Sequence, residues 1–344
     1  MKDFLRMFSD QISDVFVWGL LACILAFILT PVFTYFAYKY KFWKRERTTT
    51  VTGEVMTIKS KLHAAKHRRN IPTMAGLIFV IAIAVVTLVC NLDRAQTWLP
   101  LAALIGGALI GLVDDIINLI SDGKKTAGLR APVKFTMVTL MGVVLGWFFF
   151  AKLGYSTIHI PYLGDIGIGW LIIPLFAFVV VAMGNAVNIS DGLDGLAGGL
   201  AVSAFTVYAL IALLQGNYGI AGFCFTVVGA LIAYVWFNIY PARFFMGDIG
   251  SFALGTSLGV VAMLTDTLFL LPFVGIMFVI EVGSTLIQIL SKKFFHRKIF
   301  ISAPIHHHLE AKGWPEPKIT MRFWMLANVA GIASLVLWIT GGVL

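Results

Sequence analysis

Acidic and histidine side chains stand in polar stretches between long apolar segments of this chain. They are five aspartates and a triple histidine: Asp114, Asp115, Asp191, Asp194, Asp248, His306, His307 and His308. Carboxylates are costly near hydrocarbon, so a cluster of them needs a compensating partner. A divalent cation that holds a phosphate is such a partner. The pattern therefore indicates an enzyme that acts on phosphorylated substrates at a membrane surface.

The first acidic block is IGLVDDIINLI, which holds Asp114 and Asp115 near the end of an apolar segment. Adjacent residues of a helix point about 100° apart, so the two carboxylates are not expected to share one direction. We expect one to face a site and the other to orient a neighbouring lysine. A solvated helix end with ordinary ion pairs is the alternative.

The second block is GNAVNISDGLDGLAGG, residues 184–199. Four polar residues recur in it at three-residue spacing: Asn185, Asn188, Asp191 and Asp194. If the block is helical, they line one stripe. Ser190 or Asp191 is a candidate cap for the helix that follows, whose terminal amides would attract an anion. The glycines would let a ligand approach the backbone closely.

The third block is NIYPARFFMGDIGS, residues 238–251, where Asp248 lies between two glycines. Mg²⁺ favours carboxylate and phosphate oxygens, so Asp248 with one further aspartate would suffice to bind it. Ser251 is a candidate cap for the next helix. Phe244 and Phe245 could stack on a base, although packing in the core is the ordinary role of an aromatic pair.

The fourth block is APIHHHLEAKGW, residues 303–314. Zinc sites space their ligands so that the side chains converge, whereas adjacent histidines diverge. Donation from the histidines to phosphate oxygens is the better interpretation. Basic residues at 66–69 and 124–134 would add phosphate contacts, with Lys134 the strongest candidate because it stands at a helix start.

Composition sets the frame that must position these blocks. The chain has 344 residues, of which 59% are hydrophobic and 12% charged, against about 25% charged in a soluble domain. We therefore expect one integral-membrane domain, residues 1–344, with no separate soluble domain and no cleavable signal. The net charge of +9 is interpreted as membrane topology and not as nucleic-acid binding. The three cysteines show no metal-binding spacing.

An all-α polytopic fold follows, with about ten transmembrane helices of roughly 20 residues each. The expected spans are 15–38, 72–90, 98–118, 131–150, 170–187, 195–214, 218–237, 251–264, 268–290 and 321–341. The eighth is short. The ninth contains Pro272 and Glu281, so we expect it to be bent or broken, with Glu281 paired within the bend or placed near the cytoplasmic end.

Basic residues fix the expected orientation. Of the 26 lysines and arginines, all but Lys2, Arg6, Arg94 and Lys152 fall on one face of this topology. The positive-inside rule makes that face cytoplasmic and puts both termini outside. Every polar block then lies on the cytoplasmic side. Residues 151–169 form the one long outer loop, and their alternation predicts a small outer hairpin.

The blocks together resemble the polyprenyl-phosphate N-acetylhexosamine-1-phosphate transferase superfamily, in glycosyltransferase family 4. The matching segments are the DD pair, NAVNISDGLDGLA, NIYPARFFMGDIGS and PIHHHLEAKGWPEPKITMRFW, from about Pro72 to Trp324. The histidine block is most similar to that of the phospho-N-acetylmuramoyl-pentapeptide transferases. GlcNAc-1-phosphate transferases have a different histidine loop.

The resemblance implies a Mg²⁺-dependent transfer in peptidoglycan synthesis at the bacterial cytoplasmic (inner) membrane. Undecaprenyl phosphate would attack the β-phosphorus of UDP-MurNAc-pentapeptide, giving lipid I and UMP. It implies Asp248, or else Asp191, as metal ligand, with Asp114, Asp115 and His306 also catalytic. The implied substrate-binding residues are Arg68, Thr73, Lys125, Lys134, Asn185, Asn188, Asp191, Gly192, Leu193, Asp194, Asn238, Phe245, His307 and His308. Of these, Gly192, Leu193, Asp194 and Phe245 would form the uracil pocket.

Two departures keep other functions open. The KxGTPTMGG segment of the family is RRNIPTMAG here, with Arg68 for lysine, and GDTGS is GDIGS, with Ile249 for threonine. They leave open a transferase for UDP-GlcNAc or another UDP-sugar. A transporter of phosphorylated lipid is a separate alternative of a different class. A lipid phosphate is largely ionised at neutral pH, so a general base at Asp114 is an option and not a requirement. The family also admits a homodimer, but no segment indicates a dimer face.

Overall fold

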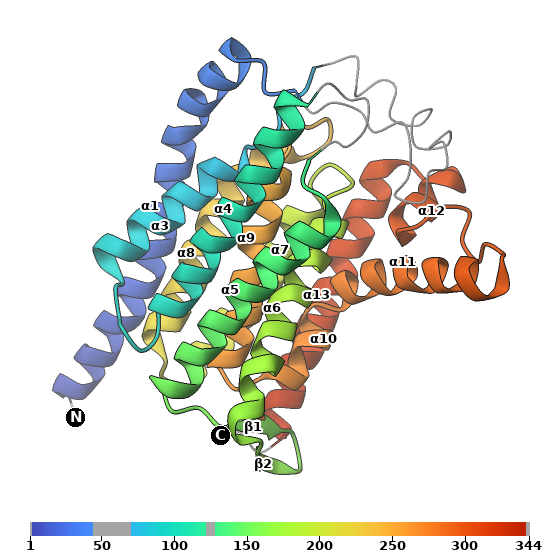
Figure 1. Ribbon diagram of the computed structural model, residues 1–344. Coiled ribbons are helices and arrows are strands. Elements are labelled where there is room, and N and C mark those ends of the chain that lie inside the picture. Colours follow the sequence, from blue (N-terminus) through green and yellow to red (C-terminus); the bar gives the residue numbers. More distant parts are fainter. Residues whose placement is uncertain (1, 44–69, 122–127, 342–344) are drawn as a thin grey trace.

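The computed structural model describes residues 2–43, 70–121 and 128–341, with side chains in the first helix from Gln11 onward. These residues form a helical bundle with one small sheet (Figure 1). Its long helices are α1 (Lys2–Lys39), α3 (Gly76–Cys90), α4 (Trp98–Ile120), α5 (Ala131–Ala151), α6 (Ile172–Ser190), α7 (Leu196–Leu214), α8 (Tyr218–Asn238), α9 (Gly247–Leu264), α11 (Ile276–Phe295) and α13 (Glu316–Thr340). Shorter elements are η1 (Gly169–Leu171), η2 (Leu268–Leu270), α10 (Leu271–Val274) and α12 (Ile305–Ala311).

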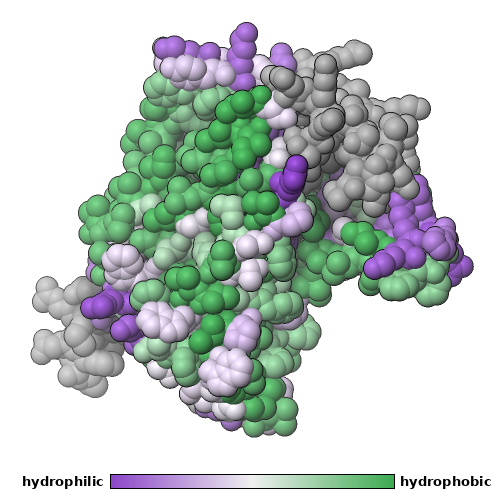
Figure 2. Space-filling model, in the orientation of Figure 1, coloured by the Kyte–Doolittle hydropathy of each residue, from purple (hydrophilic) through white to green (hydrophobic). Residues whose placement is uncertain are grey.

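The all-α polytopic prediction is confirmed, and each of the ten expected segments is mainly helical. Within the described residues, eight helices are long and apolar enough to cross a membrane. The short segment Leu268–Val274, which includes α10, and the longer α11 would together make a further span, but their axes meet at an angle of 81° with Gly275 between them. The expected break of the ninth segment is therefore present. Exposed apolar side chains cover much of the bundle's flank (Figure 2), as lipid contact requires.

Two segment lengths differ from expectation. The second segment becomes helical only at Gly76, and α3 has 15 residues, because the residues before it hydrogen-bond to Phe42 and Phe245 instead of forming a helical turn. The eighth, expected to be short, begins earlier, at Gly247, and reaches 18 residues. The polar pair Gly247–Asp248 does not look like part of an apolar span in the sequence, but it forms the first two residues of the helix.

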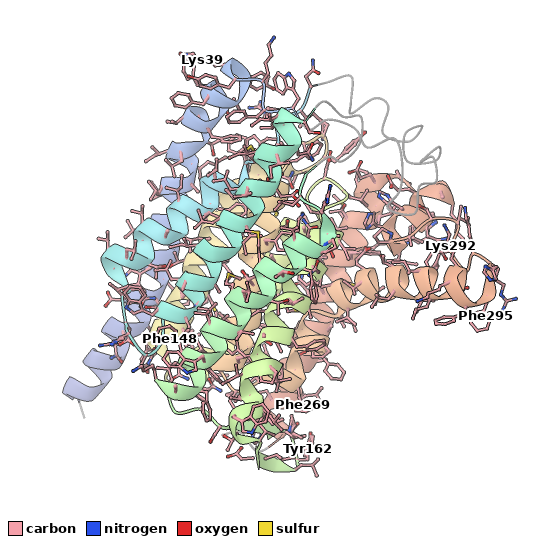
Figure 3. The ribbon with its side chains drawn as sticks, viewed as in Figure 1. Lys39, Phe148, Tyr162, Phe269, Lys292 and Phe295 are labelled. Carbon is pink, nitrogen blue, oxygen red and sulfur yellow. The ribbon has the colours of Figure 1, made fainter. Side chains whose placement is uncertain are left out.

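The two ends of the bundle differ in character. The hairpin lies at one end together with the start of α1 and the end of α13, and α12 lies toward the other end (Figure 1). Figure 3 likewise places Lys39 far from Tyr162, which is in the hairpin. Tyr162 also contacts Thr340 through their hydroxyl groups at 3.0 Å. The start of α1 and the end of α13 therefore lie at the hairpin end of the bundle.

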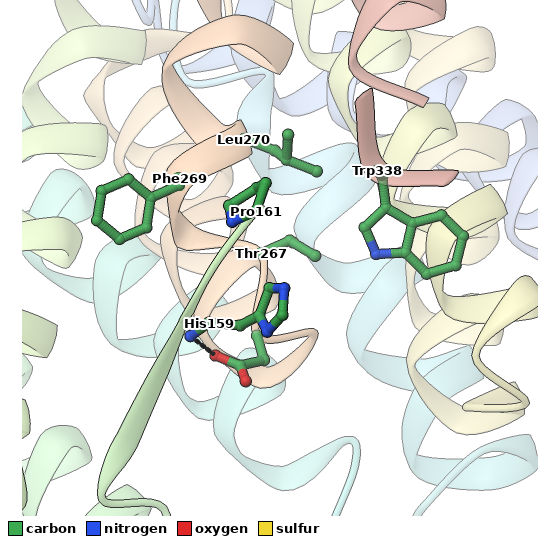
Figure 4. A pocket seen from close by; sticks show the side chains of 7 residues that line it. His159, Pro161, Thr267, Phe269, Leu270 and Trp338 are labelled. Atoms are coloured by element: carbon green, nitrogen blue, oxygen red, sulfur yellow. Dashed lines mark hydrogen bonds between the residues drawn. The ribbon is translucent and has the colours of Figure 1, made fainter. Parts of the chain in front are cut away.

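The hairpin expected in residues 151–169 forms, from β1 (Thr157–Ile160) and β2 (Gly164–Gly167). The strands are antiparallel, with Thr157 opposite Gly167 and Ile160 opposite Gly164. The amide of His159 donates to Oδ1 of Asp266 at 3.0 Å, which ties the hairpin to the turn after α9 (Figure 4). The narrow pocket in that figure, between hairpin and bundle, contains none of the predicted site residues.

Helix α9 is the centre of the bundle, with all 18 residues buried. It packs on α3, α4, α6 and α7. Small residues permit this close packing: a Cβ on Gly111 of α4 would collide with the backbone of Asp248 and Ile249. Thr256 adds a hydrogen bond from its hydroxyl to the carbonyl of Ala103 in α4, at 2.8 Å. The start of α9 is thereby held against the last turns of α4.

Candidate active site

Three carboxylates meet where α4 and α9 approach one another. Asp114 and Asp115 come from the end of α4, Asp248 comes from the first turn of α9, and one oxygen of each lies within 4.8 Å of the others. All three residues are buried. The expectation that the adjacent aspartates point to different places is only partly correct, because α9 crosses α4 closely enough for both carboxylates to reach its start.

Each α4 carboxylate nevertheless has its own protein partners. Oδ1 of Asp114 accepts a hydrogen bond from the amide of Leu129 at 2.8 Å and a salt bridge from Nζ of Lys134 at 2.9 Å. Oδ2 of Asp115 accepts from the amide of Ile249 at 3.1 Å. We expected one of the two aspartates to orient a neighbouring lysine, and Asp114 does so through its salt bridge with Lys134.

Lys134 joins two of the carboxylates. It lies in the first turn of α5, and its Nζ is 2.9 Å from Oδ1 of Asp114 and 2.5 Å from Oδ2 of Asp248. Its side chain is 16% exposed, so this ammonium bridges the two helices in a largely dry setting. The cluster holds three acidic groups and one basic group, an excess of negative charge that a divalent cation would neutralise.

Thr73 borders the same cluster from the segment before α3. That segment pairs with the loop before α9: the amide of Ala75 donates to the carbonyl of Phe245, and the amide of Phe245 donates to the carbonyl of Pro72. A Cβ built on Gly247 would lie 3.0 Å from Oγ1 of Thr73 and 2.5 Å from Oδ2 of Asp115. A buried hydroxyl and a buried carboxylate thus flank the residue before Asp248.

The 188–195 segment joins the cluster from the other side. Helix α6 ends at Ser190, so Asp191 and Asp194 lie in the loop beyond it and do not continue a helical stripe. Nδ2 of Asn188 donates to the hydroxyl of Ser251 at 2.9 Å, which links α6 to the start of α9. The amide of Asn185 instead turns back to the carbonyl of Val181 in its own helix.

The helix caps expected in this region are wrong. Helix α7 starts after Gly195, whose φ of +75° closes the turn, and no side chain caps it. The hydroxyl of Ser190 donates to the carbonyl of Ala186, inside α6. Ser251 lies within α9, where its hydroxyl bonds to the carbonyl of Gly247. Glycine geometry and backbone bonds therefore replace side-chain caps at both helix starts.

Asp194 and Asn238 hold loops together. Oδ2 of Asp194 accepts from the amide of Ala242 at 3.0 Å, and Asn238 bonds to Gly195 and Phe244 through its two amide atoms. Sequence reasoning missed two partners from the end of the histidine block: Glu316, which accepts from the amide of Asp194, and Thr320, which donates to its carbonyl. Both residues belong to the segment PIHHHLEAKGWPEPKITMRFW that matches the family, and this membership could have pointed to them.

The residues predicted to form the uracil pocket, and Asp191 as a second candidate metal ligand, lie in different surroundings. Leu193 is buried in the hydrophobic core, whereas Phe245 is half-buried. Phe244 packs among other aromatic rings, the ordinary role considered for it. Asp191 is not one of the three clustered carboxylates. Arg68 and Lys125 lie outside the described residues.

The three histidines have different partners, as expected for adjacent residues. Nδ1 of His306 is 2.8 Å from Oε2 of Glu281, in α11, and Nδ1 of His307 is 2.6 Å from Oε2 of Glu310. Nδ1 of His308 accepts from the amide of Ile301, and burial together with nearby Lys312 lowers the pKa of His308. No common metal site is formed by the three. A Cβ on Gly192 would collide with Nε2 of His306, so that ring lies directly against the 191–195 loop.

Comparison with known proteins decides the family. The chain is 36% identical to a phospho-N-acetylmuramoyl-pentapeptide-transferase of Chloroflexus aggregans over 335 residues, covering 92% of this chain and 88% of the relative. It is 38% identical to the protein of that name from Syntrophus aciditrophicus over 78% of this chain and 80% of the relative. The chain belongs to the phospho-N-acetylmuramoyl-pentapeptide-transferase family.

A match to glycosyl transferase family 4 over residues 97–266 agrees with this membership. A third relative, from Methylacidiphilum infernorum, is 36% identical over 82% of both chains. The chain is therefore an integral-membrane transferase, and the transporter alternative finds no support among these relatives. Within the family match lie the DD pair, the 184–199 block and the 238–251 block, which the fold gathers around the start of α9.

Proposed function

We propose that this protein transfers phospho-MurNAc-pentapeptide from UDP-MurNAc-pentapeptide to undecaprenyl phosphate, giving lipid I and UMP. The observation that carries the proposal is the cluster of the buried Asp114, Asp115 and Asp248 with the partly buried Lys134, built from three helices of a family member. In the reaction, a lipid phosphate oxygen forms a bond to the β-phosphorus, and the bond from that phosphorus to the bridging oxygen breaks. UMP leaves with the electron pair.

Mg²⁺ is the proposed metal, and the donor set fits it. The clustered ligand atoms are carboxylate oxygens, which suit this hard cation, and histidine nitrogens are absent from the cluster. Asp248, with Asp114 or Asp115, would hold the ion, which when bound neutralises developing charge on phosphate oxygens. Asp191 stays a weaker candidate, because the fold leaves it outside the cluster.

The protein's own groups would do the positioning. Lys134 already lies between two carboxylates, where its ammonium can contact a phosphate oxygen as the substrates bind. Asp115 is oriented by the amide of Ile249, and Thr73 offers a buried hydroxyl beside Gly247. A lipid phosphate has a second pKa of about 6 and needs little help to lose its proton near neutrality. Alignment and charge neutralisation would therefore carry the transfer.

The surroundings complete the proposal. The membrane would be the bacterial cytoplasmic membrane, with the aspartate cluster on the cytoplasmic side and the hairpin and both termini outside. Uridine would bind near Gly192, Leu193, Asp194 and Phe245, with His307 and His308 near the sugar or phosphates. A homodimer finds no support in the relatives' names and stays a prediction.

The test is a donor comparison. Purified protein in detergent receives undecaprenyl phosphate and Mg²⁺ with either UDP-MurNAc-pentapeptide or UDP-GlcNAc. UMP release is followed, and the lipid product is identified by mass. UMP and lipid I from the muramyl donor alone support the proposal. Turnover of UDP-GlcNAc alone would establish the alternative that the altered RRNIPTMAG segment keeps open.

A further inference from the structure

Glu281 is a buried carboxylate that the aspartate cluster does not include. It lies in α11, a helix with many exposed apolar side chains, yet it is 0% exposed. A buried acid is costly without a partner, and its partner here is Nδ1 of His306, 2.8 Å from Oε2. The pair joins the bent membrane segment to the histidine block.

The far side of His306 faces the proposed donor site. The residue is 1% exposed, and within the described parts of the chain Nε2 has no hydrogen-bond partner. This nitrogen lies against Gly192, where a Cβ would collide with it. Buried polar atoms rarely lack a partner, so an unpaired nitrogen beside the 191–195 loop indicates a position for a ligand atom.

The neighbouring histidines do not share this arrangement. His307 pairs with Glu310, three residues away in the same short helix. His308 accepts an amide hydrogen through Nδ1 and is part of a local turn. His306 is held by Glu281 of a membrane helix, and its second nitrogen lies against Gly192, in the loop that carries Asp191 and Asp194.

We propose that Glu281 is a positioning residue that holds His306 for an anionic oxygen of the substrate diphosphate. The carboxylate accepts the Nδ1 proton, which fixes the ring's orientation and stabilises the imidazolium. In that form Nε2 carries a proton and donates to the phosphate oxygen. This inference rests on the proposed function for the identity of the diphosphate and assigns to Glu281 a role through His306 alone.

A double-mutant cycle tests the pair. Glu281→Gln keeps the shape of the side chain and removes its charge, and His306→Asn removes Nε2. Turnover and the affinity for UDP, measured by calorimetry, are determined for both single variants and the double variant. Ser284→Ala is the matched control, because this buried residue is one turn along α11 and, among the residues that the structure describes, its hydroxyl bonds to the backbone carbonyl of Glu281 and not to its carboxylate.

The expected result is a loss of about 10- to 100-fold in kcat/KM for Glu281→Gln, as for other residues that orient a functional histidine. In the His306→Asn background, the same substitution should cost less than about threefold. The control should match the wild type, and UDP affinity should show the same coupling.

Two outcomes would overturn the inference. One is an equal loss from Glu281→Gln in both backgrounds, which would mean that Glu281 acts independently of His306. The other is a Glu281→Gln variant with unchanged turnover and UDP affinity. If the wild type fails to use the muramyl donor, the proposed function fails, and the cycle in UDP affinity still decides the role of the pair.

Discussion

At the scale of single residues, Lys134 sets the electrostatics of the cluster. Its ammonium occupies the space between Asp114 and Asp248, where a divalent cation would find two of its ligand oxygens. The lysine and the metal therefore compete for the same carboxylates, while both attract phosphate. Removing the positive charge of Lys134 and removing the negative charge of Asp248 should therefore change the metal affinity in opposite directions, while both lower turnover.

Replacing Lys134 by methionine keeps the length of the side chain and removes its charge. We expect turnover to fall about 10²-fold, since a group that stabilises phosphate charge is lost. The Mg²⁺ concentration for half-maximal activity should fall as well, because the competing ammonium is gone. A Mg²⁺ titration of UMP release measures both. Lys152→Met, at the other end of α5, is the control and should leave both values unchanged.

Asp248→Asn should have the opposite effect on metal dependence. It removes one anionic oxygen from the cluster, so the half-maximal Mg²⁺ concentration should rise while turnover falls by about 10² or more. The same titration measures both quantities. Asp266→Asn, at the hairpin end, makes the same chemical change far from the cluster. Turnover like that of the wild type in Asp248→Asn would rule out this residue as a metal ligand.

Residue types and spacing predicted the cluster's members but not their contacts. The aspartates and Lys134 were recognisable from polar blocks between apolar segments, whereas Thr73 came only from the family resemblance. The pairing of Glu281 with His306 was not, because it depends on how far α11 turns after the break at Gly275. The bonds of Asp194 and Asn238 to loop amides were likewise hidden, since backbone partners carry no sequence signal.

At the scale of elements, the crossing of α4 and α9 fixes the spacing of the carboxylates. Gly111 lies one turn from Asp114 and Asp115, and a Cβ there would meet the carbonyl of Asp248 and the amide of Ile249. Backbone atoms in the middle of a bundle cannot move aside as a flexible side chain can. Any residue larger than glycine must therefore push the start of α9 away.

Gly111→Ala tests this crossing. We expect overpacking to destabilise the protein by about 1–3 kcal/mol. We also expect the activity to fall by roughly tenfold or more, because the carboxylates are displaced. Thermal unfolding in detergent and UMP release measure the two effects. Gly106→Ala is the matched control in the same helix, because its Cβ would meet Sδ and Cγ of Met141, which belong to a flexible side chain. Equal effects of the two variants would contradict the argument.

Helices were easier to predict than their ends. Long apolar runs gave all ten helical segments, because hydrocarbon demands internally satisfied backbone bonds. The hairpin followed from the alternation of residues 151–169. The capping residues of α7 and α9 were mispredicted because the capping rule assumes a side-chain acceptor. Gly195 closes one start by its left-handed backbone, and α9 already contains the serine that was expected to cap it.

At the scale of the whole molecule, the bundle separates the aspartate cluster from the hairpin. Single-cysteine variants in a background without Cys23, Cys90 and Cys224 test the orientation. Leu163→Cys in the hairpin should react with an impermeant maleimide in intact cells freed of their outer envelope. Lys298→Cys, after α11, should react only in inverted vesicles; both positions are exposed in the structure. The reverse pattern would invert the proposed orientation.

The bend at Gly275 gives the molecule unequal halves. Helix α11 extends sideways from the bundle, with Lys292 and Phe295 near its tip (Figure 3) and exposed apolar residues such as Leu286 and Leu290 along it. With α11 lying in one leaflet, the protein would displace more area from that leaflet than from the other. Helices that lie in an interface respond to membrane curvature. Lateral pressure in that leaflet would then act on α11, and the chain would yield to it at Gly275, where the segment is bent.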